Sequence, residues 1–94
     1  MPITASTKLR RSPDASYQVV ANEAILIHLK SGVYYSLNEV GTAFWQLLDG
    51  ARSVGDCAHE IAAQSVDAPP HEVIVADLVE LARNLTRERL AVET

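Results

Sequence analysis

The stretch between Gly32 and Gly50 changes its hydrophobic period from that of a strand to that of a helix. Aromatic and β-branched side chains at positions 33–35 favour an extended strand that begins after the glycine. Apolar residues within positions 40–48 then recur at i, i+4, i+7 and i+8, which is one face of a helix. This switch predicts a mixed fold in which a strand leads into a helix and the sheet packs against helices.

Polar residues at the switch point offer two possible starts for this helix. Ser36 and Glu39 have the spacing of a capping box, and Asn38 is a second possible N-cap. At the other end, Gly50 can supply the left-handed residue that closes the helix. The sequence therefore predicts that the strand runs straight into the helix, with no loop between them.

The residues before Gly32 predict two more strands. Residues 17–20 form the first, a turn follows at 22–23, and residues 24–30 form a second strand with clean alternation. Short turns between successive strands are typical of an antiparallel meander, so we expect this arrangement for all three strands.

The third strand has two faces that we expect to differ in burial. Alternation places Val33, Tyr35 and Leu37 on one face and Tyr34 and Ser36 on the other. Because Leu37 adjoins the first helix, we assign its face to the core.

Two further helices are predicted after the first. Ser53 and Asp56 repeat the capping-box spacing in front of a helix over about residues 54–64. The third and longest helix spans about residues 71–89, with acidic residues early and arginines late, an order that complements the helix dipole. The predicted fold class is α+β: a three-stranded antiparallel β-meander followed by three helices, a layout that resembles a winged helix-turn-helix domain.

A chain of 94 residues suits one small domain. We expect residues 1–15, which are polar and show no sustained period, to form a flexible N-terminal arm, and residues 16–94 to form the domain. No apolar run is long enough to span a membrane and no signal peptide opens the chain. The single cysteine allows no internal disulfide, which fits a reducing compartment. We therefore expect a cytoplasmic protein with no membrane partner.

No set of residues has the spacing of a catalytic or metal site. His28, His71 and Cys57 lack metal-ligand spacing, and nothing places a base beside the cysteine. We expect His28 to be exposed on its strand, Cys57 to be buried on an apolar helix face, and Trp45 to lie at the partly buried edge of the core. The sequence predicts no enzyme activity, no metal and no cofactor.

The winged-helix layout leaves two binding functions open. In a DNA-binding protein the third helix would read the major groove, but its first half carries Glu72 and Asp77 and no Lys or Arg, and the formal net charge is -4. In a peptide-binding protein, an edge strand at residues 33–36 would pair with an extended peptide beside the third helix. We expect peptide binding and no nucleic-acid partner.

The switch from strand to helix also resembles a family signature, that of coenzyme PQQ synthesis protein D. The pattern G-x-Y-Y-x-L-N-x-x-G, an aromatic-rich helix and a closing D-G are matched here by residues 32–50. The resemblance covers about residues 17–92, and residues 75–81 are similar to the family's third helix. His28 departs from the pattern, because many members carry an acidic residue there.

The resemblance implies a recognition element for precursors of ribosomally synthesised and post-translationally modified peptides (RiPPs). Such a domain binds the leader segment of the precursor and presents it to a partner enzyme, without catalysis of its own. Chains of this size and pattern resemble the leader-binding proteins of lasso-peptide clusters, whose partner is a separate leader peptidase. The alternative is a peptide chaperone of quinone-cofactor synthesis that works with a radical SAM enzyme.

Family members hold the leader between the third strand and the third helix, which implies eight peptide-binding residues here. Four lie on the strand and four on the helix: Val33, Tyr34, Tyr35, Ser36, Ile74, Asp77, Leu78 and Leu81.

Overall fold

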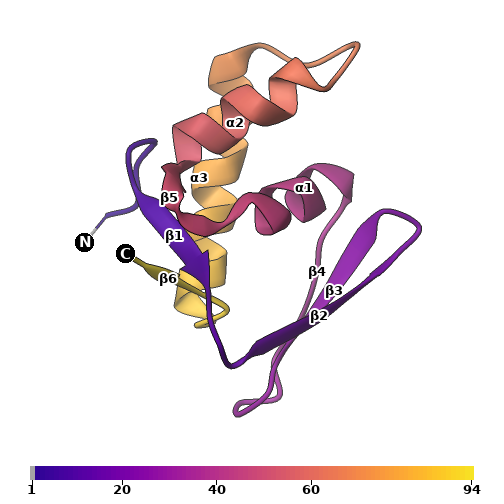
Figure 1. Ribbon diagram of the computed structural model, residues 1–94, viewed down its shortest axis with the longest axis vertical. Coiled ribbons are helices and arrows are strands. Elements are labelled where there is room, and N and C mark those ends of the chain that lie inside the picture. The colour runs from indigo at the N-terminus through magenta and orange to yellow at the C-terminus, as the bar shows by residue number, and fades with distance from the viewer. Residues whose placement is uncertain (1) are drawn as a thin grey trace.

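The computed structural model describes residues 2–94 and builds them from three helices and two antiparallel sheets of three strands each (Figure 1). The strands are β1 Lys8–Arg11, β2 Ala15–Val20, β3 Glu23–His28, β4 Tyr34–Ser36, β5 Asp49–Ser53 and β6 Ala91–Glu93. The helices are α1 Glu39–Leu47, α2 Val54–Ala63 and α3 His71–Arg87. The predicted α+β class is confirmed. No helix in the described part of the chain combines the length and apolarity needed to cross a bilayer.

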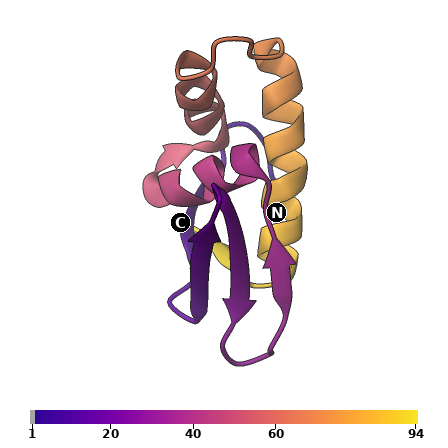
Figure 2. The ribbon, with the colours of Figure 1, turned by 90° about the vertical axis from the view of Figure 1, so that its right-hand side faces the viewer.

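The predicted meander forms the sheet β2-β3-β4, with β4 at one edge. Ala21 and Asn22 join β2 to β3 with φ angles of 52° and 66°, and two left-handed residues in a row match the twist of a tight hairpin. In the β3–β4 register, Leu26 lies opposite Tyr35 and Ile27 lies opposite Tyr34. Figure 2 shows β4 standing beside α3, with β3 and β2 farther away.

The face of β4 assigned to the core is confirmed, because Leu37 is buried and Tyr34 is 71% exposed. The prediction that His28 is exposed is wrong: it is 7% exposed, and its Nδ1 accepts hydrogen bonds from the backbone N–H groups of Lys30 and Ser31, both at 3.2 Å. Both faces of β3 carry apolar residues, so alternation alone did not show which face points inward. The imidazole instead fixes the turn that leads into β4.

The prediction of a flexible arm over residues 1–15 is wrong within the described residues 2–15. Ile3 is 6% exposed and belongs to the core, and residues 8–11 form β1. Strand β1 is the middle strand of the sheet β5-β1-β6, and its Leu9 is only 1% exposed. The partners of β1 lie far along the chain: Lys8 pairs with Ser53, and Leu9 pairs with Glu93. A four-residue strand with one strongly apolar side chain has no detectable period, so only these distant pairings reveal it.

The same sheet changes the ends of two predicted helices. Gly50 has a φ of 83° but lies inside β5, and α1 ends earlier, where the N–H of Leu48 donates to the carbonyl of Trp45. The third helix, predicted to span about residues 71–89, ends at Arg87, and Ala91–Glu93 form β6.

Two predicted helix starts have different outcomes. Asn38 caps α1, since its side-chain oxygen accepts from the backbone N–H of Gly41 at 2.8 Å, so the Ser36 box does not form. Two residues separate β4 from α1, against the predicted direct run. The box at α2 is confirmed, because the side chains of Ser53 and Asp56 each accept from the other's backbone N–H at 3.0 Å.

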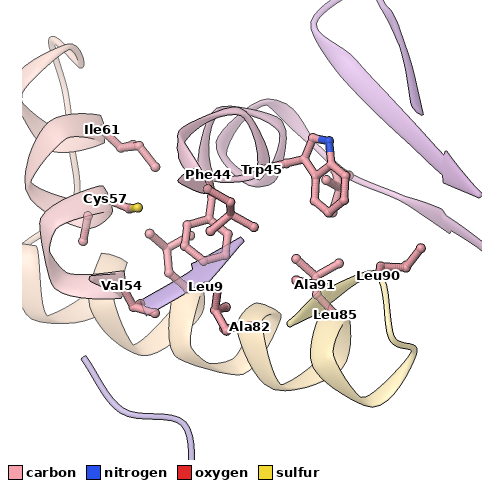
Figure 3. Close-up of a cluster of buried hydrophobic side chains, with 14 of the residues drawn as sticks. Leu9, Phe44, Trp45, Val54, Cys57, Ile61, Ala82, Leu85, Leu90 and Ala91 are labelled. Carbon is pink, nitrogen blue, oxygen red and sulfur yellow. The ribbon is translucent and has the colours of Figure 1, made fainter. Parts of the chain in front are cut away.

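The core lies between the helices and the two sheets (Figure 3). Phe44 and Trp45 project from α1 into it and are both 0% exposed. Trp45 was expected at a partly buried edge, but Tyr17 from β2 covers its ring edge-to-face, with centroids 5.7 Å apart. Cys57 is buried as predicted. The core thus packs the meander against the helices, which fixes the position of β4.

Candidate functional site

An apolar cavity of about 350 Å³ opens where β4, the start of α1 and α3 meet. It gathers six of the eight residues predicted to bind: Tyr35, Ser36, Ile74, Asp77, Leu78 and Leu81. The other lining residues come from the start of α1, from α2 and from the α2–α3 connection: Leu37, Asn38, Val40, Gly41, Ile61, Ser65 and Pro69. The sequence analysis did not predict that this second group lines the site. The one signal for it was Asn38, which was recognised as a possible N-cap of α1 but not as a neighbour of the binding residues.

Close packing between α1 and α3 shapes one wall of this cavity. A Cβ atom at Gly41 would lie 3.3 Å from side-chain atoms of both Leu37 and Leu81, so the glycine allows the two helices to approach. Ile74 and Leu78 are 5% and 1% exposed, and they serve at once as core and as cavity wall. Their substitution would therefore disturb folding as well as binding.

The backbone of β4 offers hydrogen-bonding groups on its open side. The N–H of Leu37 donates to the carbonyl of Ala24 at 2.8 Å, and the carbonyl of Val33 accepts from the N–H of His28 at 2.9 Å, so these two residues, which flank β4, turn these groups toward β3. In an antiparallel ladder every second residue does the same, here Val33, Tyr35 and Leu37, and the residues that alternate with them point the other way. The N–H and C=O groups of Tyr34 and Ser36 therefore face outward, and within residues 2–94 only β3 pairs with β4.

Val33 and Tyr34 lie outside the cavity. Tyr34 projects from the outer face of the sheet into a shallow hollow that it shares with Ile25 and Ile27. Val33 borders a separate hollow, together with Lys30 and the end of α3. The structure thus places six of the predicted residues around one cavity and these two on neighbouring surfaces.

Asn84 connects α3 to β4, and it was not among the residues predicted to belong to the site. Its side-chain N–H donates to the hydroxyl of Tyr35 at 3.2 Å, and its side-chain oxygen accepts from the guanidinium of Arg87. Asn84 follows Leu81 by three residues and Asp77 by seven, which places all three on one side of the helix. That spacing was a usable signal in the sequence. The bond connects α3 to Tyr35, a residue of β4 that also lines the cavity.

The lining of the cavity is mostly apolar. Among residues 2–94, Asp77 is the one charged side chain that lines it. Burial raises the pKa of the Cys57 thiol to about 11, so this thiol is protonated and unreactive at neutral pH. No cluster of three possible metal ligands occurs among the described residues. An open strand edge beside an apolar cavity can hold an extended peptide through its backbone and through alternate side chains.

Comparisons with known proteins point to one family. The family model described as coenzyme PQQ synthesis protein D (PqqD) matches residues 23–91. A solved structure of TbiB1 in complex with the TbiA(beta) leader peptide shares 24% sequence identity with a TM-score of 0.74, covering 87% of this chain and 93% of that one. A structure of lasso peptide synthetase B1 complexed with the leader peptide shares 21% identity with a TM-score of 0.76, covering 90% and 98%. Both similarities confirm the fold. No curated protein sequence matches the chain.

Proposed function

The chain belongs to the coenzyme PQQ synthesis protein D family, and on this basis we propose that it binds the leader segment of a ribosomally made precursor peptide and presents it to a partner enzyme. The observation that carries the proposal is the open edge of β4 beside the apolar cavity. The two similar structures support it, because each is described as a complex with a leader peptide.

We propose that the leader adds to the sheet β2-β3-β4 as a fourth strand. It would bond the outward N–H and C=O groups of Tyr34 and Ser36, and antiparallel pairing is the more stable choice. Leader side chains on the inner face would then point toward the cavity and α3, next to Ile74, Leu78 and Leu81. Those on the outer face would lie beside the exposed ring of Tyr34.

The proposed role is recognition, with the chemistry left to the partner. A lasso-peptide leader peptidase is the partner that best fits the two similar structures, one of which is named lasso peptide synthetase B1. The family description favours a second candidate, a peptide chaperone of PQQ synthesis whose partner is a radical SAM enzyme. Nucleic acid is disfavoured as a ligand, because the first half of α3 presents the exposed acidic residues Glu72 and Asp77.

Affinity should be moderate. Ordering a flexible leader costs about 2–5 kcal/mol, which ladder hydrogen bonds and burial of apolar side chains must offset. We expect dissociation constants from roughly micromolar to tens of nanomolar, or about -8 to -11 kcal/mol.

Single proline substitutions test the strand addition. Tyr34→Pro and Ser36→Pro each remove one outward N–H, so each should weaken binding on the order of tenfold through the lost bond and the intruding ring. The matched control is Val19→Pro, which removes an outward N–H at the other edge of the same sheet. The N–H of Leu29 donates to the carbonyl of Asp14, and in this register every second residue of β2 from Asp14 faces β3, so the N–H of Val19 points away from β3. Tyr34→Phe and Ser36→Ala keep both donors and should bind like the parent.

The assay is a fluorescence anisotropy titration with a labelled leader peptide, and circular dichroism confirms that each variant is folded. Mass spectrometry of the incubated peptide should find it unchanged, because the chain is not expected to cleave it. If folded Tyr34→Pro and Ser36→Pro variants bind as tightly as Val19→Pro, strand addition at β4 is wrong.

A further inference from the structure

Charge is distributed unevenly along α3, the helix that lines the cavity and ends beside the hollow that Val33 borders; the cavity, the open edge of β4 and this hollow are together called the groove. Residues 71–80 of α3 include three acidic side chains and no Lys or Arg, whereas the rest of the helix and the two residues after it, 81–89, include three arginines and one glutamate. The helix dipole favours this order, and its own charge of about half a unit at each end offsets only part of the side-chain charge. The side chains therefore set the sign of the field along the groove.

At the cavity end, the charge among the lining residues is that of Asp77. Its carboxylate is exposed at the rim and forms no ion pair, since the salt bridges of residues 2–94 are Lys30–Asp14 and Arg52–Asp49. Asp77 also lies beyond the first turn of α3, where a favourable interaction with the helix dipole has faded. Stabilisation of the helix therefore does not account for an unpaired carboxylate at an apolar rim.

At the opposite end, β4 begins beside a basic hollow. Val33 borders this hollow together with Lys30, Arg87 and Arg89. Two acidic residues, Asp14 and Glu88, also line it, and the first of these pairs with Lys30 at 3.6 Å. The two arginines outnumber the remaining glutamate, so this end attracts anions.

We infer that the groove selects its peptide by charge polarity: the bound segment carries a cationic side chain over Asp77 and an anionic side chain over Arg87 and Arg89. This inference rests on the proposed function. Because β4 runs from Val33 toward the cavity, an antiparallel peptide enters at the cavity end. Its Lys or Arg therefore lies N-terminal to the apolar central residues, and its Asp or Glu lies C-terminal to them.

The expected size of the effect follows from the exposure of these groups. Each exposed ion pair should change affinity by roughly one-and-a-half- to fivefold. Reversing the polarity of a peptide replaces two attractions by two repulsions, so we expect a difference on the order of tenfold at low salt. The difference should shrink as the Debye length falls from about 30 Å at 0.01 M salt to about 8 Å at 0.15 M.

The test is a selection of binders from an mRNA-displayed library of random 20-residue peptides on the immobilised chain. Enriched peptides should carry Lys or Arg before a central apolar stretch and Asp or Glu after it. The variant Asp77→Lys with Arg87→Glu should enrich the opposite order. The control variant Glu60→Lys with Arg10→Glu makes the same two charge changes on exposed residues outside the groove lining, and it should keep the original order.

The outcomes separate this inference from the proposed function. Peptides that bind the parent but lose affinity for Ser36→Pro, yet show no charge order, would overturn charge selection and leave strand addition standing. A charge order that does not reverse in the Asp77→Lys, Arg87→Glu variant would overturn it as well. If no enriched peptide depends on β4, both proposals fail.

Discussion

The hydrogen bond between Thr42 and Ala24 ties α1 to the meander, and its removal gives a direct test of how β4 is held in place. The backbone N–H of Ala24 donates to Oγ1 of Thr42 at 2.8 Å, where the two residues are 0% and 4% exposed. The carbonyl of the same alanine accepts from Leu37 at 2.8 Å. One residue of β3 therefore connects the helix to the end of the binding strand.

Thr42→Val keeps the shape of the side chain and removes the acceptor, leaving a buried N–H without a partner. That loss costs about 1–3 kcal/mol, which is a large share of the roughly 5–15 kcal/mol that stabilises a domain. The melting temperature should fall by about 4–8 °C for each kcal/mol in a domain of this size. Urea unfolding followed by circular dichroism measures the free energy directly.

Thr42→Ser is the control, because it keeps the acceptor and removes one buried methyl group, worth about 0.8 kcal/mol. The valine variant should be the less stable of the two. If Thr42→Val is as stable as the parent, or more stable than Thr42→Ser, then methyl packing and not the hydrogen bond holds α1 against β3.

Three further outcomes follow from the structure. Leu9→Ala should lower the free energy of unfolding by about 2–5 kcal/mol, whereas Arg10→Ala, exposed in the same strand, should change it by less than about 0.5 kcal/mol; equal effects in urea unfolding would contradict the placement of β1. Ser53→Ala should cost about 1 kcal/mol through loss of the α2 cap, and Ser53→Gly only a few tenths, as thermal unfolding would show. Burial raises the pKa of Cys57 from 9.0 to about 11, so the folded state binds more protons than the unfolded state in this range and stability should fall as pH rises from 9 to 11; fast alkylation of the native thiol at pH 7.5 would refute this.

The helices and the meander could be predicted because their signals are local. The Ser53–Asp56 box lies within four residues of sequence, and the hydrophobic period of α3 repeats along one segment. The G-x-Y-Y-x-L-N-x-x-G stretch is also continuous, so the sequence pointed to the family that the comparisons confirm. Such features need no knowledge of distant parts of the chain.

The sheet β5-β1-β6 could not be predicted, because each of its pairings joins segments that are far apart. Lys8 meets Ser53, and Leu9 meets Glu93, in strands too short to show a period. The inward turn of His28 has a similar cause, since the choice between two apolar faces of β3 depends on where α1 packs.

The candidate site divides in the same way. The motif placed Tyr34, Tyr35 and Ser36 on a strand, and the helical period placed Leu81 on α3. Only the tertiary structure decided that the backbone groups of Tyr34 and Ser36 face outward and that Asn84 reaches Tyr35 across the groove. Periodicity is a property of neighbouring residues along one segment, whereas an open edge and a groove exist only once separate segments are brought together in space.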